Sequence, residues 1–123
     1  MRAMVVDDSR AMRTLLRNLL SASGLQVVAE AGDGKEGLER LRAAGPVDLV
    51  LVDWNMPEMD GYEFVRAVRA ESQWSGVRLL LVTSETEGAR MSAALEAGAN
   101  EYLMKPFGKE AVRDKLQMLG LIE

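Results

Sequence analysis

The sequence of 123 residues contains no cysteine and no histidine, which excludes several kinds of functional site at once. Without thiols there can be neither disulfides nor thiolate metal sites. Without imidazole there can be neither histidine-based zinc sites nor Ser-His-Asp triads. The chemistry left to the chain must use carboxylates, hydroxyls, lysine or a bound ion. Any phosphohistidine in its pathway must belong to another protein.

Excess positive charge and long apolar runs are also missing. The formal net charge is −4, which argues against non-specific binding to nucleic acid or to anionic membranes. No apolar run approaches the roughly 20 residues of a membrane-spanning helix. The apolar start of the chain is too short for the core of a signal peptide. We therefore expect a cytoplasmic protein with neither a nucleic-acid partner nor a membrane partner.

The chain does contain a regular alternation of short apolar segments and longer amphipathic ones. Its length fits one domain over residues 1–123, and 48% of its residues are apolar, which is enough for a core. Short apolar runs predict strands, and apolar residues spaced i, i+3, i+4 and i+7 predict helices. The expected strands span residues 3–6, 26–31, 48–52, 78–82 and 101–104. The expected helices span residues 35–44, 62–71, 87–97 and 109–119, and a further helix carries the apolar stripe over residues 12–20 and ends before Gly24.

Alternating strands and helices predict an α/β domain whose parallel sheet is covered by helices on both faces. Two strand orders are common in such domains, the flavodoxin-like order 2-1-3-4-5 and the Rossmann order. The glycine-rich Rossmann fingerprint is absent after the first strand, where the pair Asp7-Asp8 would repel a pyrophosphate. We therefore predict a flavodoxin-like (βα)5 three-layer sandwich of order 2-1-3-4-5. The less apolar strand over residues 26–31 is expected nearer an edge.

Polar residues follow four of the predicted strands. Sites in open parallel sheets form at the carboxyl ends of the strands. In the predicted order the first, third, fourth and fifth strands are neighbours, so their ends bring together Asp7, Asp8, Asp53, Thr83 and Lys105. Two carboxylates roughly 4 Å apart repel by about 4 kcal/mol at an effective dielectric constant near 20. An all-oxygen acidic cluster therefore predicts a site for Mg²⁺, with Mn²⁺ as an alternative.

The lysine and the hydroxyl in this group indicate phosphoryl chemistry. A lysine ammonium binds phosphate as a point charge, and the Thr83 hydroxyl can donate to a phosphoryl oxygen. Aspartate can form an acyl phosphate, so Asp53 is a candidate acceptor. Taken singly, each residue has a simpler interpretation as a helix cap, a turn residue or a surface lysine: Asp8, Ser9, Asp53, Thr83, Ser84 and Lys105. Their convergence at four strand ends favours one common site.

These residues and their spacing resemble the receiver domains of bacterial two-component response regulators. The marks that match cover essentially the whole chain: Asp7-Asp8, Asp53 after an apolar strand, Thr83 after the fourth strand and Lys105-Pro106 after the fifth. Within that family, residues 53–57 and 104–107 look like the chemotaxis CheY type, as does Glu85 two residues after Thr83. As a set these motifs are highly specific.

The resemblance implies a role for each residue of the cluster. Asp53 would accept the phosphoryl group. Asp8 and Asp53 would bind Mg²⁺ through their side chains, Asn55 through its backbone carbonyl and Asp7 through a water molecule. Lys105 would contact both the phosphoryl group and the carboxylate of Asp53.

The resemblance also implies a response to phosphorylation. Thr83 would move onto the phosphoryl group, and Tyr102 would swing inward behind it. The surface formed by the fourth helix, the fifth strand and the fifth helix would change as a result. Asn55 and Glu85 would tune hydrolysis of the acyl phosphate. The peptide bond between Lys105 and Pro106 is expected to be cis.

We therefore expect a phosphorylation-activated switch that acts on no substrate beyond its own phosphorylation and dephosphorylation. A histidine kinase, a phosphotransfer protein or a small phosphodonor would supply the phosphoryl group. The phosphorylated form would bind an effector, and the flagellar motor switch is one candidate. Residues 84–89 are acidic where chemotaxis regulators usually carry basic residues, which weakens the motor assignment. Only three residues follow Gly120, which favours a stand-alone switch over a regulator with a DNA-binding domain.

Three other functions stay open at this point. The chain could be a phosphate shuttle or sink in a phosphorelay, or a receiver cut from a larger regulator. It could also be a metal-dependent phosphatase with Asp53 as the nucleophile. The phosphatase is the most distant of the three, because no second catalytic acid is placed for it.

Overall fold

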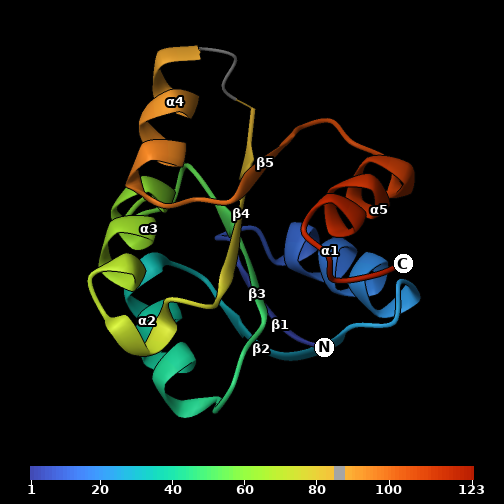
Figure 1. Cartoon of the computed structure of the whole chain (residues 1–123), viewed down its shortest axis with the longest axis horizontal. Coiled ribbons are helices and arrows are strands. Elements are labelled where there is room, and N and C mark those ends of the chain that lie inside the picture. The colour runs from blue at the N-terminus through green and yellow to red at the C-terminus, as the bar shows by residue number, and fades with distance from the viewer. Residues whose placement is uncertain (85–87) are drawn as a thin grey trace.

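Figure 1 shows a central sheet between two layers of helices. The structure is a computed structural model that describes residues 1–84 and 88–123. The strands are β1 (Arg2–Val6), β2 (Gln26–Ala31), β3 (Leu49–Asp53), β4 (Arg78–Thr83) and β5 (Glu101–Met104). The helices in the described part of the chain are α1 (Arg10–Ala22), α2 (Gly34–Ala43), α3 (Gly61–Arg69), α4 (Gly88–Ala97) and α5 (Lys109–Met118), with a 3-10 turn, η1 (Ser72–Trp74), before β4.

The strands form one parallel sheet in the order β2-β1-β3-β4-β5, which confirms the predicted order. β1 pairs directly with β3, and Val6 lies opposite Val52. β3 pairs with β4 so that Asp53 lies opposite Val82. Because no strand separates β1 from β3, the residues that follow these two strands leave the sheet side by side. The order thus brings the predicted site residues to one edge.

The burial of each strand fits its place in the sheet. β3 is buried over its whole length, and β1 and β4 are buried except at their first residues. Strands covered on both faces carry continuous apolar runs. β2 is half-buried along most of its length, as expected for an edge strand. The lower apolar content of residues 26–31 therefore predicted their position correctly.

Different helices cover the two faces of the sheet (Figure 1). α2, α3 and α4 pack on one face, around a core that includes Leu41, Phe64 and Ala94. α1 and α5 pack on the other face, around Leu16 and Leu116. Among the residues that the structure describes, no helix has the length and apolar character needed to cross a membrane.

Polar side chains fix where three helices begin. Ser9 caps α1, Asp33 caps α2 and Asp60 caps α3, each through a side-chain oxygen that accepts a backbone N–H of the first turn. In α3 the Glu63 side chain also accepts the N–H of Asp60, which completes a capping box. α2 and α3 each start one residue earlier than predicted. The apolar stripe used for the prediction does not extend into a polar first turn.

Among the other boundaries that differ from the prediction, two lie beside polar contacts. β3 begins at Leu49 instead of residue 48. Asp48 instead bonds the start of β1, where its carboxylate accepts the N–H of Arg2 at 2.8 Å. α3 ends at Arg69 instead of residue 71. The Arg69 guanidinium donates to the carbonyls of Trp74 and Val77 at 2.9 and 2.6 Å. These bonds join the end of α3 to η1 and to the segment that leads into β4.

The first residue of α3 passes close to the end of β3. A Cβ added to Gly61 would lie 2.5 Å from the backbone oxygen of Asp53 and 2.9 Å from the Cα of Trp54. We expect Gly61→Ala to lower the free energy of unfolding by about 1–3 kcal/mol, because no side-chain rotation relieves a clash with backbone. Urea denaturation measures the change. Gly76→Ala is the control, since nothing lies within 4 Å of the carbon added there. Equal effects of the two substitutions would contradict this reading of Gly61.

Candidate functional site

Three carboxylates converge where β1 and β3 end. One oxygen from each of Asp7, Asp8 and Asp53 lies within 4.8 Å of the others. Asp7 and Asp53 are 1% and 6% exposed, whereas Asp8 is exposed. The cluster therefore has a buried base and a side that is open to solvent. A cation could reach it from that open side.

Burial and mutual repulsion disfavour the fully charged form of this cluster. Burial raises the pKa of the Asp53 carboxyl, and the Asp7 carboxylate raises it further, although Lys105 acts in the opposite direction. Burial also raises the pKa of Asp7, against the lowering effects of the Ser9 backbone N–H and of Lys105. A divalent cation among these groups would offset both the free-energy cost of burying the charged carboxylates and their mutual repulsion.

One oxygen of Asp7 points to a cation site. Oδ1 accepts the backbone N–H of Ser9 at 2.8 Å. Oδ2 is buried and accepts no hydrogen bond from the described residues, although Lys105 Nζ lies 3.8 Å away. An unsatisfied buried oxygen is costly, and carboxylate oxygens are the ligands that Mg²⁺ prefers. The donor set therefore fits a magnesium ion.

Lys105 enters the cluster from the loop that follows β5. Its Nζ donates to Asp53 Oδ1 at 3.1 Å. The side chain is 25% exposed and lies within ion-pair distance of both Asp53 and Asp7, so the interpretation as a freely solvated lysine is wrong. The Lys105-Pro106 bond is cis, as the resemblance implied. Lys105 thus places a positive charge directly beside the candidate acceptor.

Thr83 is the last residue of β4 and is fully buried. Its carbonyl accepts the backbone N–H of Lys105 at 2.8 Å, which ties the end of β4 to the loop after β5. Thr83 therefore lies between the strand that carries Asp53 and the loop that carries Lys105. Glu85, predicted to tune hydrolysis, and Glu87, predicted to start the fourth helix, lie outside the described residues.

Asp53 is the last residue of β3, so it is part of the sheet and not of the following turn. Trp54 comes next and is 5% exposed, and its N–H donates to the carbonyl of Val82 at 3.0 Å. Asn55 follows and is exposed. The use of its backbone carbonyl as a metal ligand stays a prediction. The interpretation of Asp8 as a helix cap is wrong, because Ser9 caps α1.

Tyr102 is half-buried in β5, and α5 contacts its ring. Lys115 Nζ lies 4.7 Å from the ring centroid and 2.9 Å from Glu101 Oε1. The backbone N–H of Tyr102 donates to the same oxygen of Glu101 at 3.2 Å. The movement proposed for Tyr102 would therefore act on a ring that already contacts the neighbouring helix. That movement stays a prediction.

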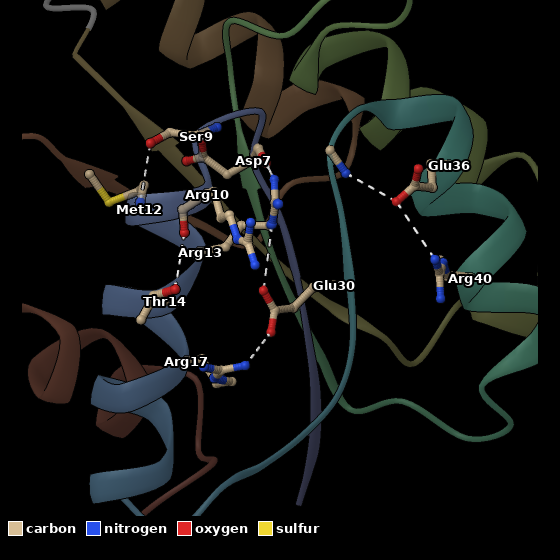
Figure 2. Close-up of polar contacts among 11 residues, drawn as sticks. Asp7, Ser9, Arg10, Met12, Arg13, Thr14, Arg17, Glu30, Glu36 and Arg40 are labelled. Carbon is tan, nitrogen blue, oxygen red and sulfur yellow. Dashed lines mark hydrogen bonds and ion pairs between the residues drawn. The ribbon is translucent and has the colours of Figure 1, made fainter.

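The sequence did not identify a second set of contacts behind Asp7. Arg13 Nη1 donates to the Asp7 carbonyl at 2.6 Å, and Arg13 Nε lies 3.5 Å from Glu30 Oε1. Figure 2 shows these contacts joining α1, the end of β1 and β2. The one sequence feature that pointed to these contacts was the predicted strand order, because it places β2 beside β1, where α1 can contact it. Periodicity alone does not say which arginine of α1 faces Glu30.

The chain is similar to proteins of one family over nearly its whole length. Residues 3–117 match the response regulator receiver domain family. Chemotaxis protein CheY1 of Helicobacter pylori is 39% identical over 119 residues, which cover 97% of this chain and 96% of that protein. A chemotaxis protein CheY homolog of Campylobacter jejuni is 40% identical over 117 residues, covering 95% of this chain and 90% of that protein.

A solved structure agrees with this match. The chemotaxis protein CheY4 of Vibrio cholerae superposes with a TM-score of 0.88 at 36% identity, and the match covers 96% of this chain and 97% of that one. The strand order 2-1-3-4-5 and the acidic cluster at the end of β1 and β3 agree with the same conclusion. The chain belongs to the response regulator receiver domain family.

Proposed function

We propose that this protein is a signalling switch that accepts a phosphoryl group on Asp53. The observation that carries the proposal is the meeting of one lysine with three carboxylates at one edge of the sheet. Lys105 Nζ lies 3.1 Å from Asp53 Oδ1, and Asp53 lies in a cluster with Asp7 and Asp8. Because the chain has no histidine, a phosphohistidine donor must be a kinase or a phosphotransfer protein.

The acidic cluster would hold Mg²⁺, and Mn²⁺ could replace it. Asp8 and Asp53 would contact the ion through their carboxylates, Asn55 through its backbone carbonyl and Asp7 through a water molecule. When bound, the ion would neutralise charge on the phosphoryl oxygens during transfer. The buried Asp7 Oδ2, which accepts no hydrogen bond in the described part of the chain, supports this assignment.

Asp53 and Lys105 would act directly in the transfer. A carboxylate oxygen of Asp53 forms the bond to phosphorus while the bond from phosphorus to the donor nitrogen breaks, so the donor keeps the electron pair of that bond. The ammonium of Lys105 stabilises the negative charge on the phosphoryl oxygens. It stays beside Asp53 afterwards, when a group of roughly −2 charge replaces a carboxylate of −1.

The switch would pass this change to a partner through the surface of α4, β5 and α5. Thr83 is buried beside the acceptor strand, and its hydroxyl would donate a hydrogen bond to an oxygen of the new phosphoryl group. Tyr102 would follow on β5. The chemotaxis names of relatives from Helicobacter pylori and Campylobacter jejuni support a chemotaxis effector as the partner. The flagellar motor switch is one such effector.

Fluorescence of Trp54 tests the proposal. Trp54 adjoins the acceptor, whereas Trp74 lies in η1, which precedes the start of β4. The start of β4 is at the edge of the sheet opposite to the site. A Trp74→Phe background therefore leaves Trp54 as the one fluorescent tryptophan. We expect Mg²⁺ to change the emission of Trp54, and beryllofluoride to change it further only when Mg²⁺ is present. If the folded protein responded to neither, the assignment of this site would be wrong.

Mg²⁺ should also stabilise the fold, because it offsets repulsion among buried carboxylates. An ion that binds only the folded state adds about 1.4 kcal/mol to the free energy of unfolding at ten times its Kd. Urea denaturation with and without MgCl₂ measures this difference. NaCl at the same ionic strength is the control. Equal effects of the two salts would show that the cluster does not bind Mg²⁺ specifically.

A further inference from the structure

Arg13 lies between the acidic cluster and the edge strand of the sheet. It belongs to α1, but its guanidinium bonds two other elements. Nη1 donates to the carbonyl of Asp7 at 2.6 Å, directly after β1. Nε lies 3.5 Å from Glu30 Oε1, on β2. Figure 2 shows the guanidinium between these two acceptors. A single side chain thus connects α1, the metal-site loop and β2.

A second arginine of α1 holds Glu30 in place. Arg17 Nη1 donates to Glu30 Oε2 at 2.9 Å, one helical turn beyond Arg13. Each oxygen of the Glu30 carboxylate therefore faces a different arginine (Figure 2). Arg17 thus restricts the orientation of the Glu30 carboxylate. In that orientation Glu30 also restrains the guanidinium of Arg13.

The other polar groups of Asp7 are fixed as well. Its N–H donates to the carbonyl of Ala31 at 3.0 Å, and its Oδ1 accepts the N–H of Ser9 at 2.8 Å. With Arg13 on the carbonyl, only Oδ2 is left without a hydrogen bond from the described residues. The backbone is thus held on both sides while the remaining oxygen is available to the cluster.

We propose that Arg13 and Glu30 are positioning residues for the metal site. Glu30 orients the guanidinium, and the guanidinium holds the carbonyl of Asp7. The loop that carries Asp7 and Asp8 is then fixed at the spacing that the ion requires. Ligands held in place before binding lose less freedom when the ion binds. The inference rests on the proposed function, because it takes Mg²⁺ as the ion.

The charge of Arg13 and its positioning contacts should have opposite effects on Mg²⁺ affinity. A cation near the cluster repels Mg²⁺, so loss of that charge alone would strengthen binding. Loss of positioning would weaken binding. Arg13→Lys separates the two effects, because lysine keeps the charge but lacks the planar guanidinium that contacts two acceptors in fixed geometry.

The test compares Arg13→Lys with Arg17→Lys by Mg²⁺ titration of Trp54 fluorescence in the Trp74→Phe background. The control makes the same chemical change on the same helix and at the same Glu30 partner. Among the described residues, however, Arg17 does not bond Asp7. We expect Arg13→Lys to weaken Mg²⁺ binding about tenfold and Arg17→Lys to change it by less than about twofold.

A second readout needs no metal. In ion-free protein, the amide hydrogens of Asp7 and Ser9 should exchange faster in Arg13→Lys than in Arg17→Lys, because the loop opens more often. Both variants are compared under conditions where urea denaturation shows them to be fully folded. A general loss of stability would speed exchange throughout the sheet and would not single out this loop.

Several results would overturn the inference. These are an unchanged Mg²⁺ affinity in Arg13→Lys, equal losses in Arg13→Lys and Arg17→Lys, or unchanged exchange of the two loop amides. If Arg13→Lys does not fold, Glu30→Gln replaces it, and we expect about threefold weaker binding; unchanged binding there would also overturn the inference. A wild-type protein that binds no Mg²⁺ would instead contradict the proposed function. Normal binding in wild type and in Arg13→Lys would contradict only the positioning role.

Discussion

Replacing Asp53 with asparagine is expected to reduce labelling of the protein by acetyl phosphate at least about a thousandfold. The substitution keeps the shape of the side chain at the end of β3 but replaces a nucleophilic carboxylate with an amide. Asp7 and Asp8 keep their carboxylates in this variant. The hydrogen bond of Lys105, however, is formed with Asp53, so the lysine is placed to assist transfer to residue 53. Phosphate incorporation, measured by intact-protein mass spectrometry with Mg²⁺ present, gives the result directly.

Asp114→Asn is the matched control for this substitution, since Asp114 is exposed on α5. It should be labelled as the wild type is. Labelling of Asp53→Asn at wild-type stoichiometry would place the acceptor at another carboxylate. Slow residual labelling at Asp7 or Asp8 would still be compatible with Asp53 as the principal acceptor.

The same substitution is expected to raise the free energy of unfolding of the ion-free protein at neutral pH by about 1–2 kcal/mol. Burial raises the pKa of Asp53 in the folded chain, so its charged form is less favourable there than in the unfolded chain. The contribution of Asp53 to stability therefore decreases as the pH rises through the range between the two pKa values. Asparagine removes that penalty. Urea denaturation of the wild type and of Asp53→Asn at two pH values measures the difference in their free energies of unfolding. An Asp53→Asn protein less stable than the wild type at neutral pH would contradict the prediction.

Replacing Lys105 with methionine is expected to weaken beryllofluoride binding about 10- to 100-fold while leaving Mg²⁺ binding intact. A hydrogen bond to a charged group contributes about 1.5–3 kcal/mol, and Lys105 supplies one beside the acceptor. Mg²⁺ should bind at least as tightly as in the wild type, because a cation 3.1 Å from Asp53 has been removed. Titrations followed by Trp54 fluorescence give both affinities.

Lys109→Met provides the comparison for Lys105→Met, because Lys109 is exposed at the start of α5. Its affinities for Mg²⁺ and beryllofluoride should equal those of the wild type. Loss of Mg²⁺ binding in Lys105→Met would mean that the lysine supports the ion and not the phosphoryl group. Unchanged beryllofluoride affinity would remove Lys105 from the proposed mechanism.

The strand order and the position of the site could be predicted from the sequence because both depend on patterns along the chain. Continuous apolar runs indicated the buried strands. The acidic start of the first loop argued against a dinucleotide site. Once the order 2-1-3-4-5 was chosen, the ends of β1, β3, β4 and β5 had to lie in that succession along one edge of the sheet. Asp7, Asp53 and Lys105 then had to meet, and their ion-pair distances bear this out.

Contacts that depend on side-chain direction across two elements could not be predicted in this way. Arg13 and Glu30 are 17 residues apart in the sequence, and nothing in either segment marks them as partners. Lys115 reaches both Glu101 and the ring of Tyr102 for a similar reason. Such pairs depend on how far a helix is rotated over the sheet. Hydrophobic periodicity gives that rotation only approximately.

The close approach at Gly61 was also hidden from sequence analysis. Glycine in a loop usually indicates a turn, and Gly61 could be read as part of the turn after Pro57. Its actual constraint is the backbone of Asp53 and Trp54, which leaves no room for a Cβ. This constraint appears only when the end of β3 and the start of α3 are seen together.

Identifying the residue that carries the phosphoryl group is the most direct test of the proposed switch. Borohydride reduces an aspartyl phosphate to homoserine, which peptide mass spectrometry can locate in the chain. After treatment with acetyl phosphate and Mg²⁺, we predict homoserine at residue 53 and unmodified aspartate at residues 7 and 8. Homoserine at residue 7 or 8 with none at residue 53, or no homoserine anywhere in a folded protein, would contradict the assignment of Asp53 as the acceptor.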